Sequence, residues 1–481
     1  MNMPVGSSIK PISVFAPAIE VGAGAASVVY NMPLPIAGWR GADGQDTWPK
    51  NYGGSSYRGP ETLRTALVKS DNTATAQALM TYVGPERSGD FLLRLGVDKE
   101  HINLTPFGLA LGSSGITPVE MATAFGVLGN GGIYQQPISF LGIADSTGKV
   151  LYDAHAEQAR RQVFKPSTAW LTVDMMKEAV RSGTATAARI SGQTVAGKTG
   201  TNSEQRGVFF SGMTGWYSAS VWIGHDNYKP LSSRTTGGNS AAKLWKAFME
   251  PLHSQKGLND RNILDGDAGQ YGLTRATTCL VSGQLATDAC QHDAMGYGTV
   301  TDWWPQESVP TVSCQMHQVA NICSVSGMPA GPYCPPELVA QRGAVVLPQG
   351  HPLAAFVGTQ YQSVLTDYLG SSIMGGAGQT TCNVHLTPFD PYGPDPYAQP
   401  QDPYAQPPEV YPGSGASLAA DAVNLMTAAS QQLATLQPDH PYYMELLNAV
   451  NDLNAQLNAD PNSPNLPAAM ARLTQAMVNA Q

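Results

Sequence analysis

The 481-residue sequence has no cysteine in its first 278 positions and carries little charge anywhere. Charged residues make up 13% of the chain, against about a quarter in an average soluble protein. The net charge is −9 and no basic stripe is present, so we expect no nucleic acid partner. The length is sufficient for two or more domains.

Long apolar runs are also missing. No stretch of about 18 uninterrupted apolar residues occurs, so the sequence predicts no transmembrane helix. The most apolar stretch, residues 11–30, is interrupted by Pro17, Glu20 and several glycines, and no secretory signal precedes it. We therefore expect neither a membrane anchor nor an export signal in this chain.

The six cysteines all lie between Cys279 and Cys382. An even, clustered set is typical of disulfides formed in an oxidising compartment. Cys314 with His317 and Cys382 with His385 are each spaced Cys-x-x-His, so a Cys2His2 zinc site is the alternative. We favour disulfides, because the spacings match no standard zinc finger.

Residues 1–250 read as one α+β domain. Helical spacing of apolar residues predicts helices at 7–22, from Pro60 with a break near Ser70, at 117–130, at 166–181 and at 236–249. A hairpin is expected at 138–153. Three short runs, one ending at Lys198 and two spanning 208–215 and 217–224, predict an antiparallel meander.

The rest of the chain changes character twice. Residues 251–385 hold all the cysteines and few periodic segments, so a loop-rich, cross-linked region is expected. Residues 386–416 repeat Asp-Pro-Tyr three times, which is typical of an extended linker. Residues 417–481 predict about three short helices that form a small bundle or dock on a partner.

The sequence Lys198-Thr199-Gly200-Thr201 is unusual for a strand end. It suits a strand edge that a substrate backbone lies against. Gly200 would permit close approach, the two threonines would supply hydroxyl donors, and Lys198 would supply a positive charge. The alternative is a turn with a solvated lysine, which a four-residue match alone does not exclude.

Two further short motifs accompany this one. Ser7 and Lys10 are one helical turn apart, so a lysine in a poorly solvated site could activate the serine. Ser70, in Ser70-Asp71-Asn72, could relay a proton, and Asn72 could bind a substrate amide. Taken alone, each of these two motifs fits a helix cap better than a functional site. Together and in this order, S-x-x-K, S-D-N and K-T-G favour an acyl-serine site.

With the surrounding sequence, these motifs resemble the transpeptidase half of a class A, bifunctional penicillin-binding protein. The stretches that carry the resemblance are PVGSSIKP, NYGGSSYRGPETLRTALVKSDNTATAQ, ITPVEMATAFGVLGNGGIY, VAGKTGTN, ASVWIGHDN and TGGNSAAKLWKAFM. The resemblance is close over about residues 4–250 and looser over 278–290 and the Cys-x-x-His pairs. It implies a β-lactamase/transpeptidase-like fold.

The resemblance also implies roles for individual residues. Ser7 would be acylated, Lys10 would be the base, and Ser70 with Lys198 would pass a proton to the leaving amine. Asn72 would bind the amide side chain of the substrate, Thr199 and Thr201 would bind its carboxylate, and Gly200 would let the peptide approach closely. The backbone N–H groups of Ser7 and Thr201 would stabilise the oxyanion. The chemistry needs neither a metal nor an organic cofactor.

The function implied is D,D-transpeptidation of peptidoglycan stem peptides, with β-lactams as inhibitors. The parent protein would be membrane-anchored, joined to a glycosyltransferase domain, and active on the extracytoplasmic face of the membrane. Because Ser7 stands near the start of the chain, the strands that normally precede it are missing. We therefore expect an N-terminally truncated piece whose three-stranded sheet has an unpaired edge.

Other functions fit parts of the pattern. A D,D-carboxypeptidase would use the same residues with water as acceptor. A β-lactamase would need a glutamate in an E-x-x-L-N loop, and residues 100–103 have the wrong spacing. A truncated, inactive wall-binding or scaffold module would explain the linker and C-terminal helices, although the intact motif set argues against it.

Overall fold

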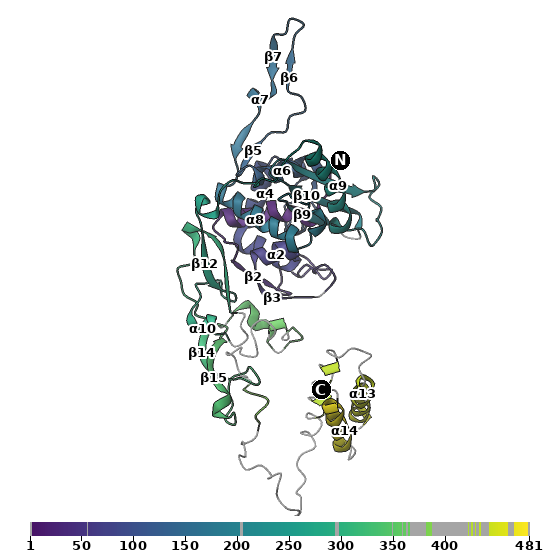
Figure 1. Ribbon diagram of the computed structural model, residues 1–481, viewed down its shortest axis with the longest axis vertical. Coiled ribbons are helices and arrows are strands. Elements are labelled where there is room, and N and C mark those ends of the chain that lie inside the picture. The colour runs from purple at the N-terminus through teal and green to yellow at the C-terminus, as the bar shows by residue number, and fades with distance from the viewer. Residues whose placement is uncertain are drawn as a thin grey trace, which may run out of the picture. The chain divides into compact units, whose positions relative to one another are not determined.

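The computed structural model divides the chain into two compact units, Met1–Pro391 and Tyr392–Gln481 (Figure 1). It describes residues 2–54, 56–202, 205–293, 298–348, 350–357, 359–361, 364–365, 381–386, single positions between 422 and 433, 442–459 and 466–479. None of the helices in these ranges is both long and apolar enough to cross a membrane.

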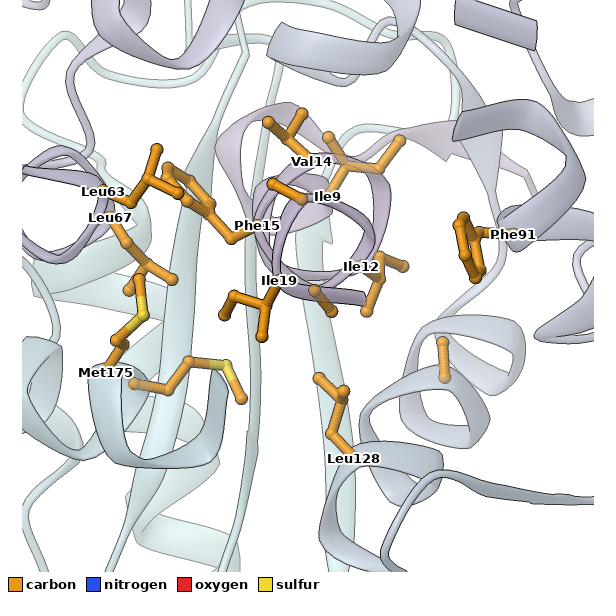
Figure 2. Close-up of a cluster of buried hydrophobic side chains, with 14 of the residues drawn as sticks. Ile9, Ile12, Val14, Phe15, Ile19, Leu63, Leu67, Phe91, Leu128 and Met175 are labelled. Carbon is orange, nitrogen blue, oxygen red and sulfur yellow. The ribbon is translucent and has the colours of Figure 1, made fainter. Parts of the chain in front are cut away.

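A buried helical run from Gly6 to Glu20 holds the first unit together. It consists of η1 (Gly6–Ile9), the π-helical turn η2 (Pro11–Phe15) and α1 (Ala16–Glu20), which confirms the helix predicted at 7–22. In Figure 2 its side chains radiate into the surrounding helices, with Phe15 directed towards Leu63 and Leu67. A helix that is apolar on all sides belongs in the interior of a large domain.

Helices surround this central run, and their boundaries follow capping signals. They are α2 (Leu63–Lys69), α3 (Asn72–Ala78), η3 (Leu79–Val83), α4 (Pro85–Arg94), α5 (Pro106–Leu111), α6 (Pro118–Gly129) and α8 (Pro166–Ser182). Thr117 and Glu120 form the predicted capping box at α6. The predicted break is confirmed at Ser70, which ends α2 in the left-handed region. Pro60, however, lies in a strand, and Thr62 caps α2 instead.

The central sheet is the predicted antiparallel meander. Its strands β9 (Ala196–Thr201), β10 (Gly207–Met213) and β11 (Ser218–Gly224) lie in the order β11-β10-β9. β10 is buried throughout: Phe209 packs into the helical core, and Phe210 packs on Trp245 of α9 (Ala242–Gln255), which follows η7 (Gly237–Ala241). Among the described residues, β9 and β11 each pair only with β10, so both are sheet edges.

Four short strand pairs complete this part of the unit. They are β1 (Met3–Pro4) with β4 (Gly115–Ile116), β2 (Val28–Asn31) with β3 (Gly59–Thr62), β5 (Ile133–Gln135) with β8 (Arg160–Gln162), and β6 (Gly142–Ala144) with β7 (Val150–Asp153). The last pair confirms the hairpin predicted at 138–153. It projects from the helical body and leads into α7 (Ala154–Glu157) (Figure 1).

The cysteine-containing region is more regular than the loop-rich region that the sequence predicted. Two antiparallel pairs of seven-residue strands form it: β12 (Leu273–Cys279) with β13 (Thr299–Pro305), and β14 (His317–Cys323) with β15 (Val339–Val345). Arg64 of α2 binds Asp302 of β13 at 2.6 and 2.9 Å and Asp174 of α8 at 2.8 Å, which attaches the region to the helices.

Short helical segments connect these elements. They are η4 (Lys99–His101), η5 (Thr186–Ala188), η8 (Ala268–Tyr271), α10 (Asp288–Gln291), η9 (Gln306–Ser308), η10 (Pro336–Leu338) and η11 (Pro352–Phe356). The second unit contains α13 (Tyr443–Ala459) and α14 (Leu466–Asn479), which share a core that includes Leu446, Leu453 and Leu473. Apart from Leu386, the Pro-rich segment predicted as a linker at 386–416 lies outside the described residues.

Replacing Phe15 by alanine tests whether the buried helical run stabilises the first unit. The side chain is fully buried, so its loss should lower the free energy of unfolding by about 3–5 kcal/mol. Phe248→Ala is the matched control, because that ring is 60% exposed, and it should change the value by less than about 0.5 kcal/mol. Urea unfolding of both variants measures the difference, and equal effects would contradict the assignment of the core.

Candidate active site

Ser7 and Lys10 occupy the first turn of the central helical run. The turn begins at Gly6, whose φ of 57° is in the left-handed region and whose N–H donates to the Gly112 carbonyl at 3.0 Å. Ser7 remains partly exposed and lines a pocket, whereas Lys10 is completely buried. One turn of helix therefore supplies both an accessible hydroxyl and a desolvated amine.

The Lys10 amine points to the turn between α2 and α3. Its Nζ donates to the Ser70 carbonyl at 2.9 Å, to the Asn72 Oδ1 at 2.8 Å and, at 3.3 Å, to the Asp71 carbonyl. Burial lowers the pKa of Lys10 from its usual 10.5 to about 7, while the nearby Asp71 and Glu61 carboxylates raise it. A pKa near 7 leaves a large share of the amine neutral at neutral pH.

Ser70 lies between two buried lysines. Its carbonyl accepts from Lys10, and its hydroxyl oxygen accepts from the Lys198 Nζ at 2.7 Å. The left-handed backbone at Ser70, with φ of 63°, is what turns its two oxygens towards different lysines. Burial, and then the charge of Lys10, lower the pKa of Lys198 well below its usual value, while Asp71 raises it.

Asn72 begins α3 and lines the same pocket as Ser7. Its Oδ1 accepts from Lys10, and its Nδ2 donates to the Lys50 carbonyl at 2.8 Å. An amide nitrogen carries two hydrogens, so one donor remains for a ligand. Lys10 and the Lys50 carbonyl at the pocket rim therefore hold the side chain in one orientation.

Strand β9 places the Lys198–Thr201 sequence at the sheet edge, beside the start of the central helical run. The Thr201 hydroxyl accepts from the Gly237 N–H at 3.0 Å, which leaves its own hydrogen available to donate, and Thr201 lines the pocket. The Thr199 hydroxyl instead pairs with the Thr184 hydroxyl at 2.9 Å. Of the two predicted carboxylate ligands, Thr201 thus has the more direct access.

Gly200 has a packing role that sequence reasoning missed. A Cβ built there would lie 2.2 Å from the Val5 carbonyl oxygen and 3.1 Å from the Ser8 nitrogen, so the missing side chain lets β9 contact the start of η1. The sequence predicted close approach of a substrate at this residue. The close approach that the structure shows is between the strand and the turn that carries Ser7.

The backbone N–H of Thr201 points away from β10. Asn202 N–H donates across the ladder to the Gly207 carbonyl at 3.0 Å, so in an antiparallel pair the N–H of Thr201 points the other way. Gly6 lies on that side, and a Cβ there would be 2.9 Å from the Thr201 nitrogen. The Thr201 N–H is therefore directed to the turn that presents Ser7.

A pocket of about 400 Å³ joins these groups. Ser7, Asn72 and Thr201 lie in its wall, as predicted site residues. The remaining lining residues come from β1, α5 and four loops: Pro4, Lys50, Asn51, Tyr52, Gly53, Phe107, Leu111, Gly112, Ser113, Asn202, Gln205 and Tyr228. Lys10, Ser70 and Lys198 lie behind this wall, where a proton network can be shielded from solvent.

Comparison with known proteins identifies the family of the chain. Residues 2–250 match the family model of the penicillin binding protein transpeptidase domain, which is more than half of the chain. The chain belongs to the penicillin-binding protein transpeptidase family. The resemblance inferred from the sequence motifs is thereby confirmed.

Named relatives support the same family. Penicillin-binding protein 1A of Clostridium perfringens is 32% identical over 322 residues, which cover 65% of this chain and 37% of that protein. The protein of the same name from Clostridium acetobutylicum is 36% identical over 255 residues, or 51% of this chain and 30% of that protein. The chain thus spans less than two fifths of the length of these relatives.

A solved structure shows that the fold is shared. The crystal structure of penicillin-binding protein 1A from Haemophilus influenzae aligns with a TM-score of 0.53 at 24% sequence identity. The alignment covers 64% of this chain and 49% of that one. The predicted β-lactamase/transpeptidase-like fold class is confirmed.

Behind the pocket of the transpeptidase domain lies a charged network that sequence reasoning missed. Arg58 donates to the Asp71 carboxylate at 2.9 and 3.2 Å and lies 3.7 Å from Glu61. Glu61 is buried, and burial followed by the charge of Asp71 raises its pKa well above the usual value. Asp71 is visible in the S-D-N motif, but nothing in the sequence linked Arg58 or Glu61 to it.

Asn202 is a second functional candidate that the motifs did not indicate. It follows the K-T-G-T sequence directly, is only 9% exposed and lines the pocket. Among the described residues its amide atoms form no hydrogen bond of ordinary geometry, although the side chain interacts with the Tyr228 hydroxyl. A buried amide without a well-formed hydrogen bond is costly unless a ligand or water satisfies it, so this side chain is suited to contact a bound ligand.

The structure contradicts the disulfides that we expected from the sequence. All six are free thiols, and none forms the disulfides that we favoured from the sequence. The alternative Cys2His2 site is also wrong in its membership, because the two Cys-x-x-His pairs belong to different clusters. Cluster I consists of Cys279, Cys290, Cys314 and His317, and cluster II of Cys323, Cys334, Cys382 and His385. Either cluster could hold a metal ion.

Gly200→Ala tests the contact between β9 and the Ser7 turn. Because the new methyl group would overlap backbone atoms of Val5, the variant should lose about 2–3 kcal/mol of unfolding free energy. Gly115→Ala is the control, since a Cβ there meets only ordinary contacts at 3.8 Å. Urea unfolding compares the two, and a Gly200→Ala variant as stable as the control would refute the close contact.

Proposed function

We propose that the chain forms peptidoglycan cross-links as a D,D-transpeptidase. Ser7 Oγ attacks the carbonyl carbon of the D-Ala–D-Ala bond in a stem peptide, an ester to Ser7 forms, and the C–N bond breaks. The serine proton is transferred to the departing D-alanine amine. An amine of a neighbouring stem peptide then attacks the ester, forms the new amide and returns a proton to Ser7.

Lys10 is the base in this proposal. A protonated lysine uses three hydrogens for its three acceptors, but a neutral amine has only two hydrogens and a lone pair. Loss of the long contact to the Asp71 carbonyl, at 3.3 Å, would leave the two shorter contacts and free the lone pair. That lone pair can accept the Ser7 proton, since the pKa of Lys10 is lowered to about 7 by burial.

Ser70 and Lys198 complete the proton path. The Ser70 hydroxyl oxygen accepts from Lys198 at 2.7 Å, so its own hydrogen is free to be donated to the leaving amine. The proton taken from Ser7 can replace it by way of the lysine network. The N–H groups of Ser7 and Thr201 stabilise the oxyanion, and the Thr201 hydroxyl and Asn72 hold the substrate carboxylate and amide.

The observation that carries the proposal is the meeting of Lys10 and Lys198 at Ser70, directly behind the pocket that Ser7 lines. Membership of the transpeptidase family supports it. By the class A resemblance, we propose that the parent protein is membrane-anchored, carries a glycosyltransferase domain and acts on the extracytoplasmic face. β-Lactams, which resemble the substrate, should acylate the same serine.

Intact-mass spectrometry after incubation with benzylpenicillin tests the proposal. The parent chain should gain one covalent adduct, and Ser7→Ala should gain none, because the nucleophile is gone. Ser113→Ala is the matched control: this serine lines the same pocket and has no assigned catalytic role, so the adduct should form. An adduct on Ser7→Ala, or none on the parent, would contradict the acyl-serine assignment.

The rate of acylation by benzylpenicillin should fall as the pH is lowered through about 7. Below the pKa of Lys10 the amine holds a proton and has no lone pair, so the rate should drop about tenfold per pH unit. Lys10→Arg, which stays protonated, should abolish the reaction. Lys50→Met, at an exposed lysine of the same pocket, should keep the profile. A pH-independent rate in the parent would exclude Lys10 as the base.

A further inference from the structure

Cluster I has the dimensions of a tetrahedral metal site. The Nδ1 of His317 lies 3.3 Å from the sulfur of Cys279 and 3.7 Å from that of Cys314. All four candidate ligand atoms, including the Cys290 sulfur, lie within 4.8 Å of one another. Zinc bonds of about 2.3 Å to sulfur and 2.0–2.1 Å to nitrogen, at tetrahedral angles, require about 3.6 Å between nitrogen and sulfur.

The histidine of cluster I is oriented for metal binding by a second contact. Its Nε2 lies 3.1 Å from the Asp293 carboxylate, and both side chains are almost completely buried. An N–H donated from Nε2 to the carboxylate leaves the Nδ1 lone pair directed at the three sulfurs. A carboxylate in this position is the usual outer partner of a metal-ligating histidine.

Cluster II repeats the same geometry. The Nδ1 of His385 lies 3.4 Å from the sulfur of Cys323 and 3.3 Å from that of Cys382, and Cys334 supplies the third sulfur. Backbone N–H groups donate to sulfur in both clusters, from Val281 to Cys279 and from Gly331 to Cys334, each at 3.3 Å. Such bonds stabilise thiolates, which are the form that binds metal.

The two clusters are a tandem repeat in sequence. Each has the order Cys-x10-Cys, then Cys-x2-His, and each first cysteine opens a similar turn, Cys-Leu-Val-Ser-Gly at 279–283 and Cys-Ser-Val-Ser-Gly at 323–327. The signal was present in the sequence. It was obscured because the third ligand follows the second by different distances, 24 residues in one copy and 48 in the other.

Equivalent backbone hydrogen bonds show that the repeat is structural as well. Cys279 N–H donates to the Gln284 carbonyl at 2.8 Å, and Cys323 N–H to Met328 at 2.9 Å. The third cysteine of each copy also donates to the equivalent residue of the turn: Cys314 N–H to Leu285 at 2.8 Å, and Cys382 N–H to Pro329 at 2.7 Å. Because the backbone fold and the candidate ligands are both repeated, we expect the two clusters to bind the same kind of ion.

Disulfides cannot account for this arrangement. Each cluster contains three cysteines, so one bridge within a cluster would leave one thiol over. Bridging the two leftover thiols would require the clusters to meet. Strand β14 carries His317 of cluster I at one end and Cys323 of cluster II at the other, about 20 Å apart for six steps along a strand. A disulfide needs its Cα atoms within about 7 Å.

We propose that each cluster binds one Zn²⁺ through three thiolates and one imidazole, so that the chain carries two structural zinc ions. Three thiols lose their protons to solvent at each site, and neutral histidine contributes a lone pair. The set Cys3His with tetrahedral spacing selects zinc among common cations, and four protein ligands leave no open position for catalysis. This proposal is independent of the acyl-serine chemistry.

Elemental analysis of the full chain, purified without chelators, tests the stoichiometry. The parent should contain two zinc ions, and Cys290→Ser and Cys334→Ser should each contain one. His292→Ala is the matched control, because this exposed histidine lies beside the cluster without belonging to it, and it should retain two. No bound metal in the parent, or no loss of metal in either cysteine variant, would overturn the proposal.

A second measurement on the parent chain does not depend on the folding of any variant. In the native chain, before any chelator is added, iodoacetamide should modify few of the six cysteines. In the unfolded chain with a chelator and no reductant, it should modify all six. If the cysteines react only after reduction, they are disulfides, and the zinc sites are refuted.

Discussion

The burial of two lysine ammonium groups on either side of Ser70 is the constraint on which the site depends. Lys10 and Lys198 are both fully buried, and each donates to a different oxygen of Ser70. Removing two like charges from water is costly, and the lowered pKa values of both lysines express that cost. The Asp71 carboxylate offsets part of this cost, because it favours the charged form of both lysines. The same desolvation that destabilises the charged amines is what makes Lys10 a usable base near neutral pH.

Several local features serve this arrangement. Gly6 and Gly200 bring the start of the helical run and strand β9 into backbone contact, which places Ser7 beside the Thr201 N–H. The left-handed Ser70 ends α2 and directs its carbonyl to Lys10. The cysteine-containing region helps to position Arg58. Met32 and Tyr57 share a core with the cysteines of cluster I, and Arg58, which follows Tyr57 directly, binds Asp71.

Much of the transpeptidase domain could be predicted because its signals are local. Thr117 with Glu120 marks a helix start, the break at Ser70 follows from the sequence around it, and three short apolar runs mark the meander. The site was less predictable where it depends on tertiary contacts. Arg58 pairs with Asp71 only because β3 packs beside the turn, and the contact between Gly200 and Val5 joins residues far apart in sequence. The four strands β12–β15 were missed since cysteine and turn residues dominate that region.

Direct titration of Lys10 tests whether burial makes this lysine a base near neutral pH. With ¹³C-labelled lysine, the Cε resonance that disappears in Lys10→Arg can be followed as the pH is varied. We expect a midpoint near 7 for this lysine, because burial disfavours its charged form more than Asp71 and Glu61 favour it. A midpoint for Lys10 near the usual 10.5 would exclude Lys10 as the base, since an amine that is protonated at neutral pH cannot take the Ser7 proton.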